Sequence, residues 1–484
     1  MTPSLSSRSA EGQRPRTLTW VRFAALAGLA LSTCAALEVL ETVVDRDGDV
    51  LVVEDILEGF GRVPVSVVFS PTTSHMFIGF KAGGVRIYPD GADTVAAAVY
   101  DSCVDMEEDV YENNDLGLLN FQLHPDWPTV PYGYMVYTHD PGFEDDCLVE
   151  PFFCEKDHRL VRVEVSLNEG TGKVTCGAQE ILINDWCTGS NHHGGGGMSF
   201  LSNGDMVMTV GDMSKADQRD PGDQEENTCL RANVGLPQGN FRAIMDDFNE
   251  GKLLRISSEA LVMAASGDAS TTGFLVRDTD FWLEAKGFRN PFRLAVSPVN
   301  GDIIIADVGL DTSESIKVVP NPLENLDEQS MPNTGWPCIE GDAWIPPYAA
   351  EWLVENESDA CDAVRDTTLG LPLEIDYDAL KTKALNGEVD WSPPAFVYSD
   401  GVIDEEYPEF CANTQSSVSA LHIYQGVHLP ERYRNRLFVG DYSKDCAFYF
   451  DMDDTTGAVD WTTPHVLFEN RAVVDFSTDP KTGM

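Results

Sequence analysis

The residues best suited to chemistry lie in one short segment, Asn191–Met198, in which two histidines precede four glycines. An imidazole titrates near neutrality, so His192 or His193 could act as a general base. Four residues without a Cβ would let the backbone approach a flat or bulky ligand and leave both histidines uncrowded. The alternative is a flexible glycine loop that carries two surface histidines. The segment therefore indicates either a base beside a binding surface or an exposed loop.

A second segment, Gly287–Leu294, places a permanent cation next to an amide. Arg289 can polarise a carbonyl or quinone oxygen, and Asn290 can donate a further hydrogen bond. The alternative for Arg289 is a salt bridge between neighbouring parts of the fold. A third segment, Asp307–Glu314, offers carboxylates and backbone carbonyls that suit calcium, and surface acidity is the competing explanation.

Short strands must position these segments, because β-branched and aromatic runs bounded by turn residues dominate the chain and long amphipathic helices are scarce. One unit recurs: a turn rich in Pro, Asp, Asn or Gly, then an apolar strand, then Gly or Asp. Six unevenly spaced returns predict an all-β, six-bladed β-propeller that forms one domain over residues 37–484. A row of β-sandwiches would need linkers between similar blocks, and none is present. The returns begin at Ser70, His124, Ser202, Ser297, Tyr433 and Ser477.

The first 36 residues have the pattern of a signal peptide, since arginines precede the apolar run Phe23–Leu31 and small residues follow it. That run is too short to span a bilayer, and no later stretch approaches the roughly 20 apolar residues of a transmembrane helix. We therefore expect a secreted or periplasmic protein without a transmembrane segment. Cleavage near Ala36 is the expected processing, and lipid attachment at Cys34 is the alternative.

Ten cysteines follow the leader, an even number that predicts disulfides in an exported protein. No CxxC pair supplies the short ligand clamp of a zinc site. Pairing of Cys147 with Cys154, or of Cys338 with Cys361, would close short loops, but the spacing leaves the connectivity open.

The charge balance excludes whole classes of partner. The chain has 80 Asp and Glu against 32 Lys and Arg, a formal net charge of -48. Such a surface repels nucleic acid phosphates and anionic lipids, so we expect no nucleic acid partner. It favours solubility and cations, calcium among them.

Seven motifs occur in a fixed order along the chain: Gly117–Trp127, His193–Asp212, Gly251–Ile256, Gly287–Arg293, Asp307–Gly309, Thr334–Gly341 and Phe438–Tyr442. Together they make the chain resemble the glucose/sorbosone dehydrogenase family. This family includes soluble quinoprotein sugar dehydrogenases and hedgehog-interacting-protein-like proteins. Its six-bladed propeller agrees with the repeat count.

The resemblance implies a chemistry for the first two segments. In the dehydrogenases, pyrroloquinoline quinone (PQQ) lies over the central channel with calcium against it, and the anomeric hydroxyl of a sugar is oxidised. His193 would be the base that removes the hydroxyl proton while hydride moves to the quinone. Arg289 and Asn290 would hold and polarise the quinone oxygens.

The resemblance also implies a metal site in the third segment. The backbone at Gly309 and Leu310 matches the calcium-bearing turn, and Glu314 matches one carboxylate of a second calcium site.

Five positions near the expected cofactor depart from the family pattern. An acidic residue, Asp115, stands where the family has a glutamine near the quinone, and His192 stands where an aspartate often precedes the base. Basic positions opposite the cofactor carboxylates fall on Gln425 and Cys446, and the aromatic ligand next to the second calcium is Thr334.

Two functions follow from these residues. The first is an exported PQQ-dependent oxidoreductase that acts on an aldose or related sugar. The alternative is a non-catalytic extracellular binding protein of the hedgehog-interacting-protein-like type, whose partner would be a protein ligand. A calcium-stabilised scaffold is a third possibility. The enzyme requires that His193, Arg289 and Asn290 meet at one end of the central channel.

Overall fold

The computed structural model describes residues 16–20, 39–44, 50–55, 60–90, 108–140, 156–168, 170–215, 239–265, 273–310, 312–324, 331–341, 343–344, 377–399 and 415–483, with a few isolated positions between them. Within the predicted leader only β1 (Arg16–Trp20) is described. It pairs in parallel with β3 (Val50–Asp55), which also pairs with β2 (Val39–Val44). The expected processing site near Ala36 and the alternative at Cys34 lie outside the described residues.

Five antiparallel sheets of three or four strands form the body of the described structure. Sheet I contains β4 (Pro64–Phe69), β5 (Met76–Phe80) and β6 (Val85–Tyr88). Sheet II contains β7 (Leu118–Leu123), β8 (Tyr132–His139), β9 (Lys156–Asn168) and β10 (Lys173–Thr188). Sheet III contains β11 (Gly195–Phe200), β12 (Met206–Val210), β13 (Lys252–Ile256) and β14 (Phe281–Lys286).

The last two sheets follow the same plan. Sheet IV contains β15 (Asn290–Val296), β16 (Ile303–Val308), β17 (Ser313–Val319) and β20 (Phe396–Ser399). Sheet V contains β21 (Val418–Ile423), β22 (Leu437–Asp441), β23 (Cys446–Phe450) and β24 (His465–Glu469). A two-stranded ladder, β18 (Ile339–Glu340) with β19 (Ala343–Trp344), stands apart.

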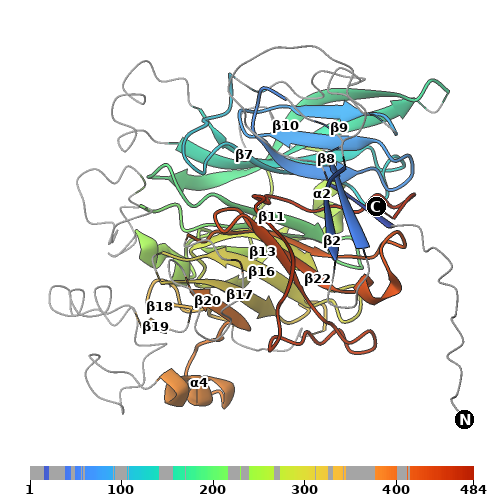
Figure 1. Cartoon of the computed structure of the whole chain (residues 1–484). Helices are drawn as coiled ribbons and strands as arrows, with labels where there is room; N and C mark the ends of the chain where they lie inside the picture. Colours follow the sequence, from blue (N-terminus) through green and yellow to red (C-terminus); the bar gives the residue numbers. More distant parts are fainter. Residues whose placement is uncertain are drawn as a thin grey trace, which may run out of the picture.

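The first strands of the five sheets lie beside one another, which is the arrangement of propeller blades. Strand β4 contacts β7, β7 contacts β11, β11 contacts β15, and β15 contacts β21. Figure 1 shows the sheets in this order, from blue and cyan through green to yellow and red. The prediction of a β-propeller is confirmed.

The predicted number of blades is wrong by one among the described residues, which form five such sheets and not six. The sixth return, Ser477–Gly483, lies in the last described stretch of the chain, and residues 470–483 contain no strand. It belongs to an irregular segment that lies against sheet I, where Asp475 accepts the N–H of Val67 at 2.9 Å and Asp479 accepts the Ser74 hydroxyl at 2.8 Å. The turn signal alone therefore does not identify a sixth sheet among the described residues.

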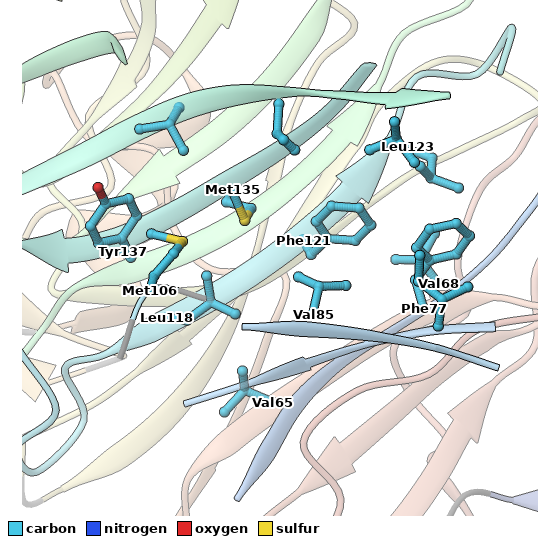
Figure 2. Packing of buried hydrophobic residues seen from close by; sticks show 14 of the residues in the cluster. Val65, Val68, Phe77, Val85, Met106, Leu118, Phe121, Leu123, Met135 and Tyr137 are labelled. Carbon is cyan, nitrogen blue, oxygen red and sulfur yellow. The ribbon is translucent and has the colours of Figure 1, made fainter. Parts of the chain in front are cut away.

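Apolar faces of neighbouring sheets pack together between the blades. Between sheets I and II, Phe77 stacks on Phe121 with ring centroids 5.7 Å apart, and Trp127 meets the edge of Phe77. Figure 2 shows Val85 next to Phe121, with Leu118 in the same cluster. Each fully buried side chain of this size contributes roughly 1.5–3 kcal/mol, so the strand alternation is fixed by burial.

Helical structure is short in the described residues: η3 (Asn240–Ile244), α2 (Ser258–Val262), α4 (Tyr377–Leu385) and η5 (Glu431–Tyr433). None of these helices has the length and apolar character needed to cross a bilayer. Disulfides are present as predicted, joining Cys187 to Cys229 and Cys411 to Cys446. Cys176 and Cys338 are also disulfide-bonded.

Candidate active site

One end of the propeller gathers the predicted site residues. In each antiparallel pair, the start of the first strand faces the end of the second, so Asn290 at the start of β15 lies opposite Val308 at the end of β16. The starts of β7, β11 and β15 meet here. The Asp115 carboxylate accepts the backbone N–H of His193 at 2.7 Å and the side-chain amide of Asn290 at 3.2 Å. Three blades therefore bring these residues together.

His193 is held by a buried carboxylate that the sequence analysis did not single out. Its Nδ1 lies 2.6 Å from Oδ1 of Asp212, and the two side chains are 2% and 0% exposed. The histidine has a left-handed backbone with φ of 64°, and the close approach of Gly211 to its carbonyl leaves no room for a Cβ at residue 211. The local backbone is therefore shaped to place this ring.

Four donors converge on the Asp212 carboxylate. Besides the ring of His193, the backbone N–H of Ser214 donates at 3.0 Å, the amide of Asn240 at 3.1 Å and the indole of Trp336 at 2.7 Å. Burial raises the pKa of Asp212, but His193, Arg289 and the bond from Ser214 outweigh it and lower this pKa to about 2. Asp212 is an anion at neutral pH.

Nε2 of His193 and Oδ1 of Asp115 are among the buried polar atoms of the site that have no hydrogen-bond partner among the described residues. Buried polar atoms are normally satisfied, so an unpartnered imidazole nitrogen on an otherwise fixed ring points to a ligand. With Nδ1 donating to Asp212, Nε2 carries the lone pair of the neutral ring.

Arg289 contacts both the turn that follows β16 and the ring of Trp336. Its guanidinium donates to the carbonyls of Val308 and Gly309 and lies 5.4 Å from the ring centroid of Trp336. Its backbone N–H and that of Asn290 donate to Asp307, the latter at 2.8 Å. The Arg289 carbonyl accepts the N–H of Asp212 at 2.8 Å, so the backbone joins the His193–Asp212 pair directly to Arg289.

Asp307 is itself paired with a buried cation. Nζ of Lys317 lies 2.5 Å from its Oδ2, with the two side chains 6% and 3% exposed. The same ammonium donates to the Thr334 hydroxyl at 3.1 Å. Thr334, expected near a second calcium, therefore takes part in this polar network.

Two buried carboxylates organise the turn expected to carry calcium. Glu314 accepts the N–H of Gly309 at 3.4 Å and that of Val418 at 3.2 Å, while Glu340 accepts the N–H of Leu310 at 2.7 Å. The described residues contain no group of three or more His, Cys, Asp or Glu side chains arranged for a metal. The calcium assignment for Gly309, Leu310 and Glu314 stays a prediction.

The glycine run has a different role from the one expected. A Cβ at Gly196 would lie 2.8 Å from Cβ of Leu119 on β7, and one at Gly197 would lie 2.9 Å from the backbone nitrogen of Leu294 on β15. The glycines let β11 pack tightly between two blades. The expectation of uncrowded histidines is also wrong for His193, because the ring is fully enclosed.

The other departures from the family pattern are placed differently. His192 is half-buried beside His193, with ring centroids 6.1 Å apart. Gln425 follows the far end of β21 and bonds to Asn435 near the surface, and Cys446 is in a disulfide. Neither residue provides a basic group at the site. Gln425 lies at the opposite end of its blade, and Cys446 is uncharged in its disulfide.

Asp212, Trp336 and Lys317 are the site residues that sequence reasoning missed. Asp212 had a usable signal, since an aspartate lies within two residues of the end of the second strand in three blades, as Asp212, Asp307 and Asp441. Trp336 and Lys317 reach the site from distant segments, and their spacing gave no indication of it.

Comparison with known proteins places this geometry in a family. A model described as glucose / sorbosone dehydrogenase matches residues 62–344, more than half of the chain. None of the curated proteins matches. The PQQ-bound aldose sugar dehydrogenase of Streptomyces coelicolor is 14% identical, with a TM-score of 0.51 over 92% of this chain and 89% of its own.

The apo-form of the soluble aldose sugar dehydrogenase of Escherichia coli is 16% identical, with a TM-score of 0.51 over 92% of this chain and 93% of its own. At such identities the two structures show a common fold. Combined with the match over residues 62–344, they lead to one conclusion: this chain belongs to the glucose/sorbosone dehydrogenase family.

Proposed function

We propose that the protein is an exported, quinoprotein-type sugar dehydrogenase that oxidises the anomeric hydroxyl of an aldose, with PQQ as the hydride acceptor. One observation carries the proposal: the His193 ring is fixed by Asp212, is almost fully buried, and keeps Nε2 without a protein partner. His158 is also buried with Nε2 unpartnered within the described chain, but its Nδ1 meets the Thr138 hydroxyl, so the carboxylate of Asp212 is what sets His193 apart.

His193 would take the hydroxyl proton on Nε2. The imidazolium that forms would face the Asp212 anion, whose low pKa keeps it charged while the ring gains its proton. General bases of this kind contribute roughly a hundredfold to ten-thousandfold in rate. Asp212 also fixes the tautomer, because a carboxylate can only accept from Nδ1.

The residues present fit a quinone in part. Arg289 and Asn290 would hold it, since a guanidinium beside an aromatic face offers fixed positive charge to an oxygen that becomes negative. When bound, PQQ supplies the two-electron acceptor. Asp115 does not suit a cofactor carboxylate, because two anions at that point would repel each other. Glu314 and the carbonyls of the Gly309–Leu310 turn are the groups that would hold calcium, and the Gly309 carbonyl would have to give up its bond from Arg289 to do so.

Reconstitution tests the proposal. Purified protein is mixed with PQQ and calcium, and bound-quinone absorbance and dye reduction with aldoses are measured. We expect both signals, and we expect His193→Asn to lose at least a hundredfold in kcat while still binding the cofactor. His465→Asn is the matched control, because His465 pairs with Asp451 at 3.6 Å on the outer strand β24, outside the site. Absence of both signals at micromolar PQQ would refute the enzyme assignment.

One observation favours the alternative, a non-catalytic extracellular binding protein. Cys446 stands where the family resemblance calls for a cation opposite the cofactor carboxylates, and it is locked in a disulfide with Cys411. Losing a partner of a buried charge costs about 3–5 kcal/mol, enough to abolish cofactor binding. The same titration with PQQ separates the two functions.

A further inference from the structure

The short helix η3 holds donors against the carboxylate of Asp212. The side-chain amide of Asn240, the first residue of η3, donates to Oδ2 of Asp212 at 3.1 Å and also to the Ser214 hydroxyl. The indole of Trp336 donates to the same Oδ2, and Trp336 lies in one apolar cluster with Phe241, the second residue of η3. Both donors to Oδ2 therefore depend on where η3 lies.

The internal hydrogen bonds of η3 do not explain why it stays in this place. A 3₁₀-helix of five residues is longer than most, and its hydrogen bonds are poorer than those of an α-helix. No side chain caps its N-terminus. The last carbonyls of a helix have no partner within it, so groups outside η3 must bind them.

The ammonium of Lys252 binds these carbonyls. Its Nζ donates to the carbonyl of Arg242 at 2.8 Å, to that of Ala243 at 2.9 Å and to that of Glu250 at 2.8 Å. An ammonium has three hydrogens, so the three acceptors use all of them. Lys252 is 0% exposed and begins β13, where it pairs with Val210 at the end of β12. It therefore ties the end of η3 to sheet III.

The backbone next to Lys252 is shaped for this contact. Gly251 has a left-handed backbone with φ of 68°, and a Cβ there would collide with Ala243 in η3. The N–H of Gly251 donates to the carbonyl of Gly211 at 2.8 Å, one residue before Asp212. The end of η3 is thus in direct contact with the start of β13, and a shift of η3 would move Asn240 relative to Asp212.

We propose that Lys252 is a positioning residue for the removal of the substrate proton. By holding the carbonyls at the end of η3, it keeps the Asn240 amide against Asp212 and so fixes the carboxylate that orients His193. The inference rests on the proposed function and adds a residue to that same site. It acts through position, because a general base must lie within hydrogen-bond reach of the proton that it takes.

Three variants separate positioning from a general loss of stability. Lys252→Met keeps an unbranched side chain and removes the three donors. Asn240→Ala removes the amide at the other end of η3. Lys286→Met is the matched control, because Lys286 pairs with Lys252 across β13 and β14 but its ammonium bonds the exposed carboxylate of Asp246 at 2.9 Å. Exposed ion pairs of this kind contribute little to stability.

The first measurement is dye reduction by the reconstituted enzyme, at a temperature at which circular dichroism shows every variant folded. Lys252→Met and Asn240→Ala should each lower kcat about tenfold, since both cost Asp212 the same hydrogen bond. KM should stay within about twofold. The double variant should lose no more than either single variant, because both changes break one path. Lys286→Met should match the wild type.

Two kinetic results would overturn the proposal. One is a kcat of Lys252→Met equal to that of the wild type. The other is a double variant that loses about a hundredfold, because independent effects multiply and a merely structural lysine would not be coupled to Asn240. If Lys252→Met does not fold, Lys252→Gln takes its place, since it removes the charge, keeps an amide donor and should show the same coupling at smaller size.

A second measurement works without the cofactor. Proton NMR of the PQQ-free protein observes the hydrogen on Nδ1 of His193, which the 2.6 Å bond to Asp212 shifts downfield and burial protects from exchange. His193→Asn assigns the signal by removing it. Lys252→Met and Asn240→Ala should shift this signal in the same direction, and Lys286→Met should leave it in place.

The NMR result separates this inference from the proposed function. If the signal shifts in Lys252→Met but the wild type never reduces the dye, the proposed function alone fails. A signal unchanged in Lys252→Met, or absent from the wild type, overturns the role of Lys252 whatever the activity.

Discussion

Two buried aspartates, Asp212 and Asp307, occupy equivalent places in neighbouring blades but have different partners and different roles. Asp212 follows β12 and orients the ring of His193, whose Nε2 has no partner among the described residues. Asp307 is the penultimate residue of β16 and fixes the backbone of Arg289 and Asn290. Asp307 is neutralised by Lys317, whereas the donors to Asp212 are mostly uncharged dipoles.

The same position of the repeat therefore carries a carboxylate whose charge is neutralised in one blade and a carboxylate whose charge is kept in the next. The positive charge of Lys317 balances that of Asp307, so this pair fixes the backbone of Arg289 and Asn290 without adding net charge. Dipolar partners leave Asp212 with its charge, which suits the role that we propose for His193 as the acceptor of the substrate proton. In a third blade, Asp441 accepts the hydroxyl of Tyr398 at 2.6 Å, and burial raises its pKa, so the same position serves packing there.

The largest expected effect is on stability, from removing the cation of the frame. Lys317→Met leaves the Asp307 carboxylate buried without its partner, which should cost about 3–5 kcal/mol of unfolding free energy. Urea unfolding measures it. Pairing the change with Asp307→Asn should recover most of the loss, and a single-variant cost below about 1 kcal/mol would show that the frame does not need its ion pair.

The next effect falls on activity. Asp212→Asn replaces the anion behind His193 by a neutral amide, so the imidazolium formed during proton removal loses its counter-charge. We expect kcat in the reconstituted enzyme to fall on the order of a hundredfold, about 3 kcal/mol in the barrier. Steady-state dye reduction checks this, and an unchanged kcat would make Asp212 a frame like Asp307.

A smaller effect should come from separating β11, which follows His193, from β15, which begins at Asn290. In Gly197→Ala the new Cβ would meet the backbone of Leu294 at 2.9 Å, between β11 and β15. Backbone cannot move aside cheaply, so we expect a loss of about 2 kcal/mol in unfolding free energy. Gly170→Ala is the control, because its nearest atom is a side-chain oxygen of Asn168 at 3.4 Å in an exposed turn. Equal melting temperatures for the two variants would contradict the tight packing.

The smallest effect concerns histidines that lack a carboxylate clamp. Burial lowers the pKa of His158 to about 3 and that of His422 to about 4. The unfolded chain binds their protons near pH 6.5 and the folded one does not, so stability falls as pH drops below 6.5.

At pH 5.5 each of these two histidines should cost about 1 kcal/mol relative to pH 7.5. Asp212 adds nothing in this window, because its stabilisation is lost only as pH falls from about 4 towards 2. Melting curves at the two pH values test this. His422→Gln should weaken the pH dependence, and a slope equal to the wild type would be the contrary result.

Much of the fold was predictable because the repeat is local. A Pro- or Asn-rich turn followed by a β-branched run identifies the second strand of a blade, and β5, β12, β16 and β22 lie where the repeats predicted them. The number of blades was not predictable from turns alone, since the turn at Ser477–Gly483 belongs to a stretch, residues 470–483, that contains no strand.

The site was predictable in its parts and not in its connections. His193, Arg289 and Asn290 carry distinctive chemistry in a short span. The bonds that define their roles join residues far apart in the chain, as when Trp336 donates to Asp212 across 124 positions. Such contacts follow from the way blades pack, which periodicity does not encode. The ten cysteines predicted disulfides, but the pairing of Cys187 with Cys229 could not be deduced from spacing.

Arg293 links the first sheet, the fourth sheet and the last described segment of the chain. From the inner strand β15 its guanidinium reaches the carbonyl of Val65 on β4 and lies 3.5 Å from Asp475, which also accepts the N–H of Val67. The first blade and the last irregular segment thus depend on one side chain from the fourth sheet. Fraying of either would leave a buried charge without its partner, so the Val67 amide should be among the slowest in the molecule to exchange its hydrogen for deuterium.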